Sequence, residues 1–452
     1  MYAMALWFET ALLPSGWTRN VRLSISHRRI VKIETGVDAA ADDERHAIAI
    51  PGLCNVHSHG FQRGMAGLAE VRGPEGDNFW TWREVMYRFL DKLTPEQIEA
   101  ITAQAYVEML EAGFTRVGEF HYLHHDAAGQ PYSNLGETAE RIAAAAERTG
   151  IALTLLPVFY AHSNFGGAAA TSGQRRFLNT VDQFVALMEA SRKAVLALVD
   201  ANLGVAPHSL RAVTPCELKA ITPMARGGPI HIHAAEQTRE VDDCTAWSGQ
   251  RPVEWLLTHA DVDERWCLVH ATHLTASETA ALTKTRAIAG LCPVTEANLG
   301  DGIFPAAEYL QQQGRIGVGT DSNVYIDVAA ELRSVEYGQR LKNRSRNVLA
   351  LSEGESTGRR LFDAALAGGA QALGQPVGGI REGGPADLVS LDAHHPSLFG
   401  RAGDAILDSW IFAGARIDCV WRGGRKLVQQ GKHLARDEIA IRYRRAIESV
   451  LE

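Results

Sequence analysis

The sequence predicts an α/β protein in which a parallel (β/α)8 (TIM) barrel carries a small β-sandwich domain. Apolar strand-like runs alternate with helical patterns eight times between residues 50 and 375. Both ends of the chain hold short strands, and 452 residues are enough for a barrel of ~250 residues and a second unit. We expect the sandwich at 1–48 with 378–435, the barrel at 49–377 and a C-terminal helix at 436–452.

The terminal segments contain strands that need partners. Residues 21–25 (Val-Arg-Leu-Ser-Ile) alternate apolar and polar side chains, which is typical of a half-buried strand. The N-terminal strands are too few to be stable alone, and Gly423-Gly424 is typical of a hairpin turn near the other end of the chain. We therefore expect the two ends to form one domain. The C-terminal strand-like runs are 386–391, 418–421 and 426–428.

The middle of the chain supplies the barrel. Thr94-Pro95-Glu96-Gln97 is a good helix start, because threonine can cap the helix and proline suits its first position. Similar helical patterns lie at 137–148, 180–198 and 252–259. No G-x-G-x-x-G follows the first strand, which argues against a dinucleotide-binding fold. The predicted strands are 48–55, 114–120, 152–159, 202–206, 229–235, 266–271, 287–292 and 316–320.

Composition excludes several classes of partner. The net charge is −8 without a block of like charges, so nucleic acid and anionic membranes are not expected partners. The six cysteines form no C-x-x-C pair and suit the reduced thiols of a cytoplasmic protein. The first 13 residues are too short to span a bilayer and lack a signal-peptide layout.

Reactive side chains follow the predicted strands at the end where barrel enzymes place their sites. His57 and His59 are two residues apart, so on extended backbone they face the same side and can bind one metal ion. By itself, this pair is explained as easily by chance as by metal binding. The same barrel end also receives His233, Glu236, His270 and Asp321. Together these residues predict a metal-dependent site.

This pattern resembles the amidohydrolase superfamily over essentially the whole chain. No lysine lies in 201–211, where two-metal members carry a bridging lysine, and His233-x-x-Glu236 resembles the one-metal deaminase branch. More narrowly, the chain is similar to formimidoylglutamate deiminases in N-V-H-S-H-G-F-Q-R, F-W-T-W-R-E, E-F-H-Y-L-H-H, A-P-H-S-L-R-A-V, H-I-H-A-A-E-Q and L-V-H-A-T-H. The resemblance implies hydrolysis of N-formimino-L-glutamate to N-formyl-L-glutamate and ammonia in histidine degradation.

The residue types suit that chemistry. Three imidazoles and one carboxylate, from His57, His59, His233 and Asp321, fit one zinc ion per chain. Asp321 can also accept a proton from water. His270 can orient that water, and Glu236 can protonate the imine nitrogen.

Arginine is suited to bind the carboxylates of a small anionic substrate. Arg83 lies in an aromatic-rich segment after strand one, and Arg211 follows strand four. Without the resemblance these arginines would be weak candidates, because surface loops often carry arginine, and we assign Arg63, Arg175 and Arg176 to that class. The remaining candidate substrate-binding residues are Gln62, Tyr122 and His208.

The residues alone leave three other functions open. The same site could deaminate a purine, pterin or pyrimidine. A metal-stabilised binding protein fits less well, because a purely structural site would need no acid such as Glu236 nearby. A two-metal amidase fits less well, because the bridging lysine is absent. Loops 60–90 and 163–174 are expected to cover the site. A homodimer is expected from base rates and from the resemblance.

Overall fold

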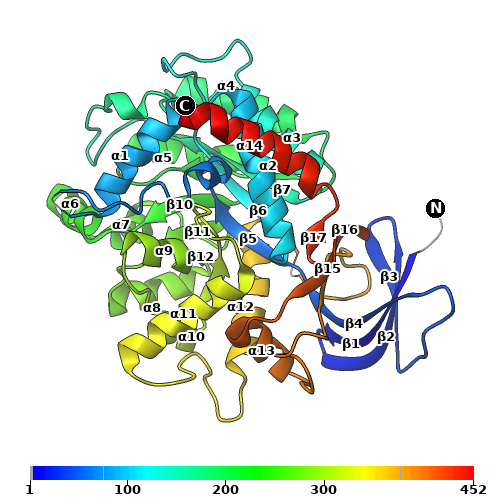
Figure 1. Ribbon diagram of the computed structural model, residues 1–452. Coiled ribbons are helices and arrows are strands. Elements are labelled where there is room, and N and C mark those ends of the chain that lie inside the picture. The colour runs from blue at the N-terminus through cyan, green and yellow to red at the C-terminus, as the bar shows by residue number, and fades with distance from the viewer. Residues whose placement is uncertain (1–3, 75, 377) are drawn as a thin grey trace.

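The computed structural model describes residues 4–74, 76–376 and 378–452, and its centre is a ring of parallel strands (Figure 1). One arc has the order β5-β6-β7-β8, with β9 beside β7, and the other has the order β10-β11-β12-β13. The bridges Val205–Ile230 and Ser58–Asp321 join the arcs at both seams. The strands are β5 (Leu53–Ser58), β6 (Phe114–His121), β7 (Ala152–Phe159), β8 (Asn202–Leu203), β9 (Ala206–Pro207), β10 (Ile230–Ala234), β11 (Trp266–His270), β12 (Ile288–Leu291) and β13 (Arg315–Val318).

Helices surround this ring, and α2 begins as predicted. The Thr94 hydroxyl accepts a hydrogen bond from the Gln97 backbone N–H, the Thr94 backbone N–H donates one to the Gln97 side-chain oxygen, and Pro95 is the first helical residue. The predicted cover loop at 60–90 contains two helices, η1 and α1, and residue 75 within it lies outside the described residues. The helices are η1 (Gly60–Met65), α1 (Phe79–Leu90), α2 (Pro95–Glu111), α3 (Glu137–Thr149), η2 (Ser172–Gln174), α4 (Val181–Val195), α5 (Pro215–Ile221), η3 (Thr222–Ala225), α6 (Thr238–Ser248), α7 (Pro252–His259), α8 (Ala276–Thr285), α9 (Pro293–Leu299), α10 (Ala306–Gln311), α11 (Val328–Asn343), α12 (Thr357–Ala372), α13 (Ala405–Ala413) and α14 (Arg436–Leu451).

The terminal segments form one eight-stranded sheet of order β17-β16-β15-β14-β4-β1-β2-β3. The predicted sandwich is therefore one continuous sheet that encloses its own apolar core, which includes Phe8 and Trp421. The exact domain boundaries stay a prediction, and residue 377 lies outside the described residues. The strands are β1 (Met4–Leu13), β2 (Gly16–Ser26), β3 (Arg29–Thr35), β4 (Glu44–Pro51), β14 (Leu388–Leu391), β15 (Ile417–Arg422), β16 (Arg425–Gln429) and β17 (Lys432–His433).

The prediction of one strand over 48–55 is wrong, because the chain changes sheets there. Residues up to Pro51 belong to β4 of the terminal sheet, and β5 begins at Leu53 in the barrel. Between them, a Cβ atom on Gly52 would lie only 2.3 Å from a side-chain carbon of Thr115. Glycine therefore lets the backbone pass from one sheet to the other. The shift places His57 inside β5 and His59 directly after it.

The C-terminal helix α14 packs against α2 and η1. The Lys92 ammonium donates a hydrogen bond of 2.8 Å to the Val450 carbonyl. A Cβ on Gly64 would lie 2.9 Å from the Ile447 side chain, so helix and η1 are in close contact. Because η1 directly follows β5 and carries Gln62, the C-terminal helix supports one wall of the barrel end at which β5 finishes (Figure 1).

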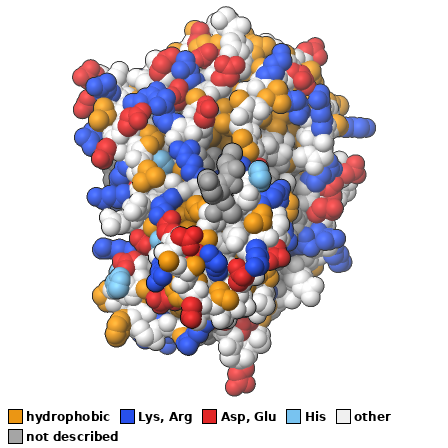
Figure 2. Space-filling model, turned by 90° about the vertical axis from the view of Figure 1, so that its right-hand side faces the viewer, with side chains coloured by type: hydrophobic (Ala, Val, Ile, Leu, Met, Phe, Trp, Pro, Cys, Tyr) orange, Lys and Arg blue, Asp and Glu red, His pale blue; other side chains and the backbone are white. Residues whose placement is uncertain are grey.

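The surface beside the terminal sheet carries basic and acidic side chains interspersed, without a large area of one sign (Figure 2). This agrees with the absence of charge blocks in the sequence. Among the described residues, no helix is both long and apolar enough to cross a membrane.

Replacing Asp387 with asparagine is expected to stabilise the protein more at neutral than at acidic pH. Burial raises the pKa of Asp387 to about 6, although the Gly423 backbone donates a 2.6 Å hydrogen bond to its carboxylate. A raised folded-state pKa favours folding below the unfolded value of ~3.8, and this stabilisation is lost as pH rises through about 6. Asparagine keeps the acceptor and avoids the buried charge.

Urea unfolding at pH 4.5 and 7.5 measures this effect. The free energy of unfolding of Asp387→Asn, relative to that of wild type, should be on the order of 1–2 kcal/mol higher at pH 7.5 than at pH 4.5. Asp38→Asn, at an exposed position, is the matched control and should show no such gain. An equal Asp387→Asn effect at both pH values would contradict the argument.

Candidate metal centre and active site

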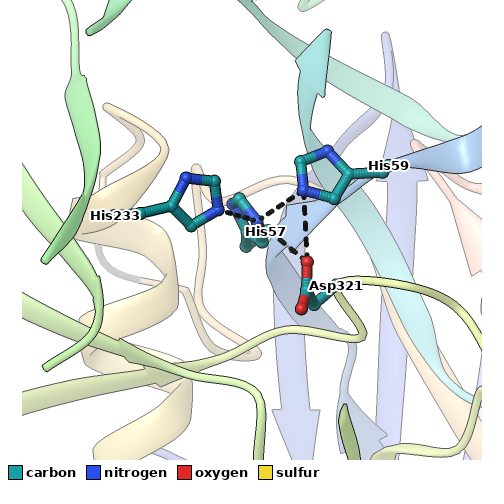
Figure 3. A group of neighbouring side chains, drawn as sticks. All are labelled: His57, His59, His233 and Asp321. Atoms are coloured by element: carbon teal, nitrogen blue, oxygen red, sulfur yellow. Dashed lines mark hydrogen bonds and ion pairs between the residues drawn. The ribbon is translucent and has the colours of Figure 1, made fainter. Parts of the chain in front are cut away.

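Four side chains from distant parts of the chain converge at the carboxyl end of the barrel strands (Figure 3). The Nε2 atom of His57 lies 3.2 Å from Nε2 of His59 and 3.2 Å from Nε2 of His233. The Asp321 Oδ1 atom is 3.2 Å from the Nε2 atoms of both His57 and His59. A tetrahedral ion with bonds of ~2.0–2.1 Å has ligand–ligand spacings close to these.

The hydrogen bonds of these histidines test whether a cation fits. The Nδ1 atom of His59 faces the Phe120 carbonyl at 2.9 Å, and Nδ1 of His233 faces the His208 carbonyl at 3.0 Å. Because each Nδ1 must carry the proton to bond a carbonyl, the neutral rings present Nε2 lone pairs to one another. Burial also lowers the pKa of His57 to about 3, which keeps it neutral. Converging lone pairs and a carboxylate fit a divalent metal ion.

One cavity lies above this cluster and brings the other candidate residues together. His59, His233 and Asp321 form part of its wall, and Tyr160 and Phe177 add aromatic surface. Glu236 and His270 also line it. All five predicted substrate-binding residues lie in the same wall: Gln62, Arg83, Tyr122, His208 and Arg211.

Glu236 lies where it can exchange a proton with a bound molecule. Its carboxylate is 3.7 Å from Nε2 of His270 and 3.3 Å from the Arg211 guanidinium. Burial raises the pKa of Glu236, so the carboxyl group tends to hold its proton. Glu240 is fixed by the backbone N–H groups of Ala235 and Glu236 and contacts the same guanidinium at 3.9 Å.

Arg83 and Arg176 lie in different environments, because Arg83 lines the cavity and Arg176 is buried away from it. Arg83 on α1 stacks over Trp80, with its guanidinium carbon 4.5 Å from the ring centre, and has no acidic partner within 4 Å among the described residues. The assignment of Arg176 to the surface is wrong. Arg176 is buried and donates hydrogen bonds to the carbonyls of His125, Leu90 and Leu93, so it ties α1 to neighbouring loops.

Comparisons with known proteins agree with this geometry. Residues 48–427 match the model of the amidohydrolase family, which is metal-dependent. The chain belongs to the amidohydrolase family. Residues 4–47 match the N-terminal domain of formimidoylglutamate deiminase HutF.

Individual proteins match most or nearly all of the chain. A formimidoylglutamate deiminase of Pseudomonas aeruginosa is 50% identical over 99% of this chain and 100% of its own. A crystal structure described as an amidohydrolase from Brucella melitensis is 56% identical, with a TM-score of 0.97 over 99% of this chain and 100% of its own. A 5-methylthioadenosine/S-adenosylhomocysteine deaminase of Natronomonas pharaonis is 30% identical over 81% of this chain and 78% of its own.

Glu296 is a residue of this amidohydrolase site that sequence reasoning missed. Its carboxylate lies 3.2 Å from Nδ1 of His270 and accepts the Cys292 backbone N–H at 2.9 Å. The signal was available, because Glu296 follows predicted strand seven by one helical turn. His270 and Asp321 also have positive φ angles of 68° and 44°, a strained backbone often found at functional sites.

Replacing Glu296 with glutamine is expected to lower kcat about 10-fold, because partners that orient a catalytic imidazole typically contribute 10–100-fold. Glutamine keeps the size of the side chain and removes the charge that holds the Nδ1–H of His270. The variant should keep its metal and its KM, and its pH–rate profile should shift. Glu308→Gln, at an exposed position on α10, is the control. Unchanged kcat and pH profile in Glu296→Gln would exclude this positioning role.

Proposed function

We propose that the chain hydrolyses N-formimino-L-glutamate to N-formyl-L-glutamate and ammonia, a step of histidine degradation. The observation that carries this proposal is one cavity that holds both the metal cluster and two arginines, Arg83 and Arg211. The full-length similarity to a formimidoylglutamate deiminase and the match of residues 4–47 to that enzyme's N-terminal domain support the same substrate.

The proposed reaction adds water to the carbon of the C=N bond and then breaks the bond to the terminal nitrogen. A zinc ion held by His57, His59, His233 and Asp321 would supply Lewis-acid activation of water at neutral pH. We assign to Asp321 the acceptance of the water proton, which is passed on to the departing nitrogen. The Nε2 atom of His270 orients the attacking water.

Glu236 is the proposed acid for the imine nitrogen. Burial raises its pKa, which favours the protonated form, and its carboxyl group faces the same cavity as the metal ligands. Protonation makes the C=N carbon a better electrophile. The nitrogen leaves as ammonia, the remaining hydroxyl proton returns to Glu236, and the formyl C=O replaces the imine.

The two substrate carboxylates are assigned to the two arginines of the cavity, whose guanidinium groups both lie beside the Trp80 ring. Arg83 reaches in from α1 as a cation without an acidic partner among the described residues. Arg211 enters from the end of strand four, and His208, Tyr122 and Gln62 supply further polar contacts. The Gln62 amide donates a 2.7 Å hydrogen bond to the Tyr122 hydroxyl, which fixes both groups. Such donors suit a small dicarboxylate.

Ammonia release from metal-reconstituted enzyme tests the function. We expect kcat/KM for N-formimino-L-glutamate to exceed that for adenosine or guanine by at least about 10³-fold, because the purines leave Arg83 unpaired. The purine alternative gains some support from the 30% identity to a deaminase of adenosine derivatives. Preferential turnover of adenosine or guanine would overturn the proposal and favour that alternative.

Three further assignments accompany this function. We propose zinc as the ion in the barrel site, from the three-imidazole, one-carboxylate set. We propose a cytoplasmic location, supported by six free cysteines. We propose a homodimer on base rates. Metal analysis, cell fractionation and light scattering test these assignments separately.

A further inference from the structure

We propose that the terminal sheet holds a second metal site, built from His46, Asp418 and Cys419, that binds a transition-metal dication such as Zn²⁺. One ligand atom from each residue lies within 4.8 Å of the other two. The Asp418 Oδ2 atom is 3.5 Å from Nδ1 of His46 and 3.4 Å from Sγ of Cys419. A tetrahedral ion with bonds of ~2.0–2.3 Å to N, O and S requires spacings of this size.

The strand arrangement brings the three ligands together. His46 lies on β4 and the other two on β15, and β14 separates these strands in the sheet. Pairing of β14 ends at Leu391, which lies opposite Ile48 and Ile417. His46 lies two residues beyond that end, so its imidazole can reach toward the start of β15. An ion here would connect two strands that share no backbone hydrogen bonds.

The imidazole is oriented as a metal ligand. Its Nε2 atom lies 2.7 Å from the Glu44 carboxylate, which directs Nδ1 toward Asp418. A carboxylate on the far ring nitrogen is the usual partner of metal-binding histidines, because it fixes the tautomer and raises basicity. The ring also packs edge-on against Trp421, with ring centres 4.8 Å apart. The His46 side chain is only 10% exposed.

Charge balance favours a dication. Lys426 pairs with Glu44, and Asp418 beside the thiol has no lysine or arginine within 4 Å among the described residues. Without an ion, the Cys419 thiol donates a hydrogen bond to Asp418. A bound ion would replace that proton, and the thiolate and carboxylate would neutralise its two charges.

The site has both a polar interior and a path to solvent. Ser390, paired directly with Cys419, is buried, and its hydroxyl has no hydrogen-bond partner in the part of the chain that the structure describes. On the other side, Asp418 lines a cleft between the barrel and the terminal sheet, with Gln430 and Gly431 in the same wall. The Asp418 side chain is 33% exposed, so an ion can enter and water can complete its coordination.

Cobalt titration of the chelator-stripped, tag-free full-length enzyme tests the proposal. We expect two equivalents of Co²⁺ per chain, and one of them should give a near-ultraviolet thiolate-to-cobalt band. The barrel cluster contains no cysteine, so the band reports the terminal-sheet site alone. Cys419→Ser should remove the band and one equivalent, with unchanged turnover. Cys216→Ser, at an exposed cysteine, is the matched control and should keep both.

His46→Gln provides a second variant from the other strand, and it should also bind one equivalent and keep full turnover. Retained turnover shows that either variant is folded. A single equivalent in wild type, or a band that survives Cys419→Ser, would overturn the proposal. The ion count does not depend on the substrate. Two ions without ammonia release would therefore support this site and contradict the proposed function.

Discussion

Replacing Glu236 with glutamine is expected to lower kcat for N-formimino-L-glutamate by about 10²–10⁴-fold, the usual contribution of a positioned general acid. Glutamine has nearly the same shape and can still accept a hydrogen bond from Arg211, which lies 3.3 Å from the carboxylate. It cannot donate an acidic proton to the imine nitrogen. Metal content should stay unchanged, because Glu236 is not among the four residues of the metal cluster.

Steady-state kinetics and metal analysis check this prediction. Glu240→Gln is a matched control, because Glu240 also contacts Arg211 but does not line the cavity, and it should lose less than about 10-fold. In the wild type, burial raises the pKa of Glu236, so kcat should fall as pH rises above that pKa and the acid loses its proton. Full activity in Glu236→Gln would exclude Glu236 as the proton donor.

Replacing Arg83 with methionine is expected to lower kcat/KM for the dicarboxylate by about 10²–10³-fold. Each hydrogen bond from a charged donor contributes ~1.5–3 kcal/mol, and every ~1.4 kcal/mol corresponds to a factor of ten. Methionine keeps the apolar stem that packs on Trp80 and removes the guanidinium. Arg83 has no acidic partner within 4 Å among the described residues, so the loss should affect substrate binding more than folding.

The comparison variant for this experiment lies on the same helix. Arg88→Met changes an exposed arginine of α1 and should keep kcat/KM within about twofold, because exposed charges contribute little. Thermal unfolding of both variants should match wild type within a few degrees. If Arg83→Met binds the substrate as well as wild type does, the substrate carboxylate must lie elsewhere in the cavity.

Much of the candidate site could be predicted from residues at strand ends, because a barrel brings such residues to one rim. His57, His59, His233 and Asp321 needed only approximate strand positions. The change of sheet at Gly52 could not be predicted from hydrophobicity, because the runs on both sides are equally apolar.

Other features depended on packing that a single sequence does not reveal. Helix α1 was expected to be part of a cover loop, yet its buried residues Phe79, Met86, Phe89 and Leu90 recur at helical spacing. Arg176 looked like a surface residue, because residues 171–175 before it are polar or glycine, yet it donates to three backbone carbonyls from two segments of the chain. Glu296 was missed because predicted strand seven ends without a histidine or carboxylate at its tip.

The seam that closes the barrel has a consequence for how the protein matures. Asp321 and Ser58 form the bridge between the last and first barrel strands, and the metal ligands lie on both sides of it. During synthesis, His57 and His59 leave the ribosome long before Asp321. A nascent chain can therefore hold at most a loosely bound ion, and capture of a tightly bound one would mark the moment at which the ring has closed.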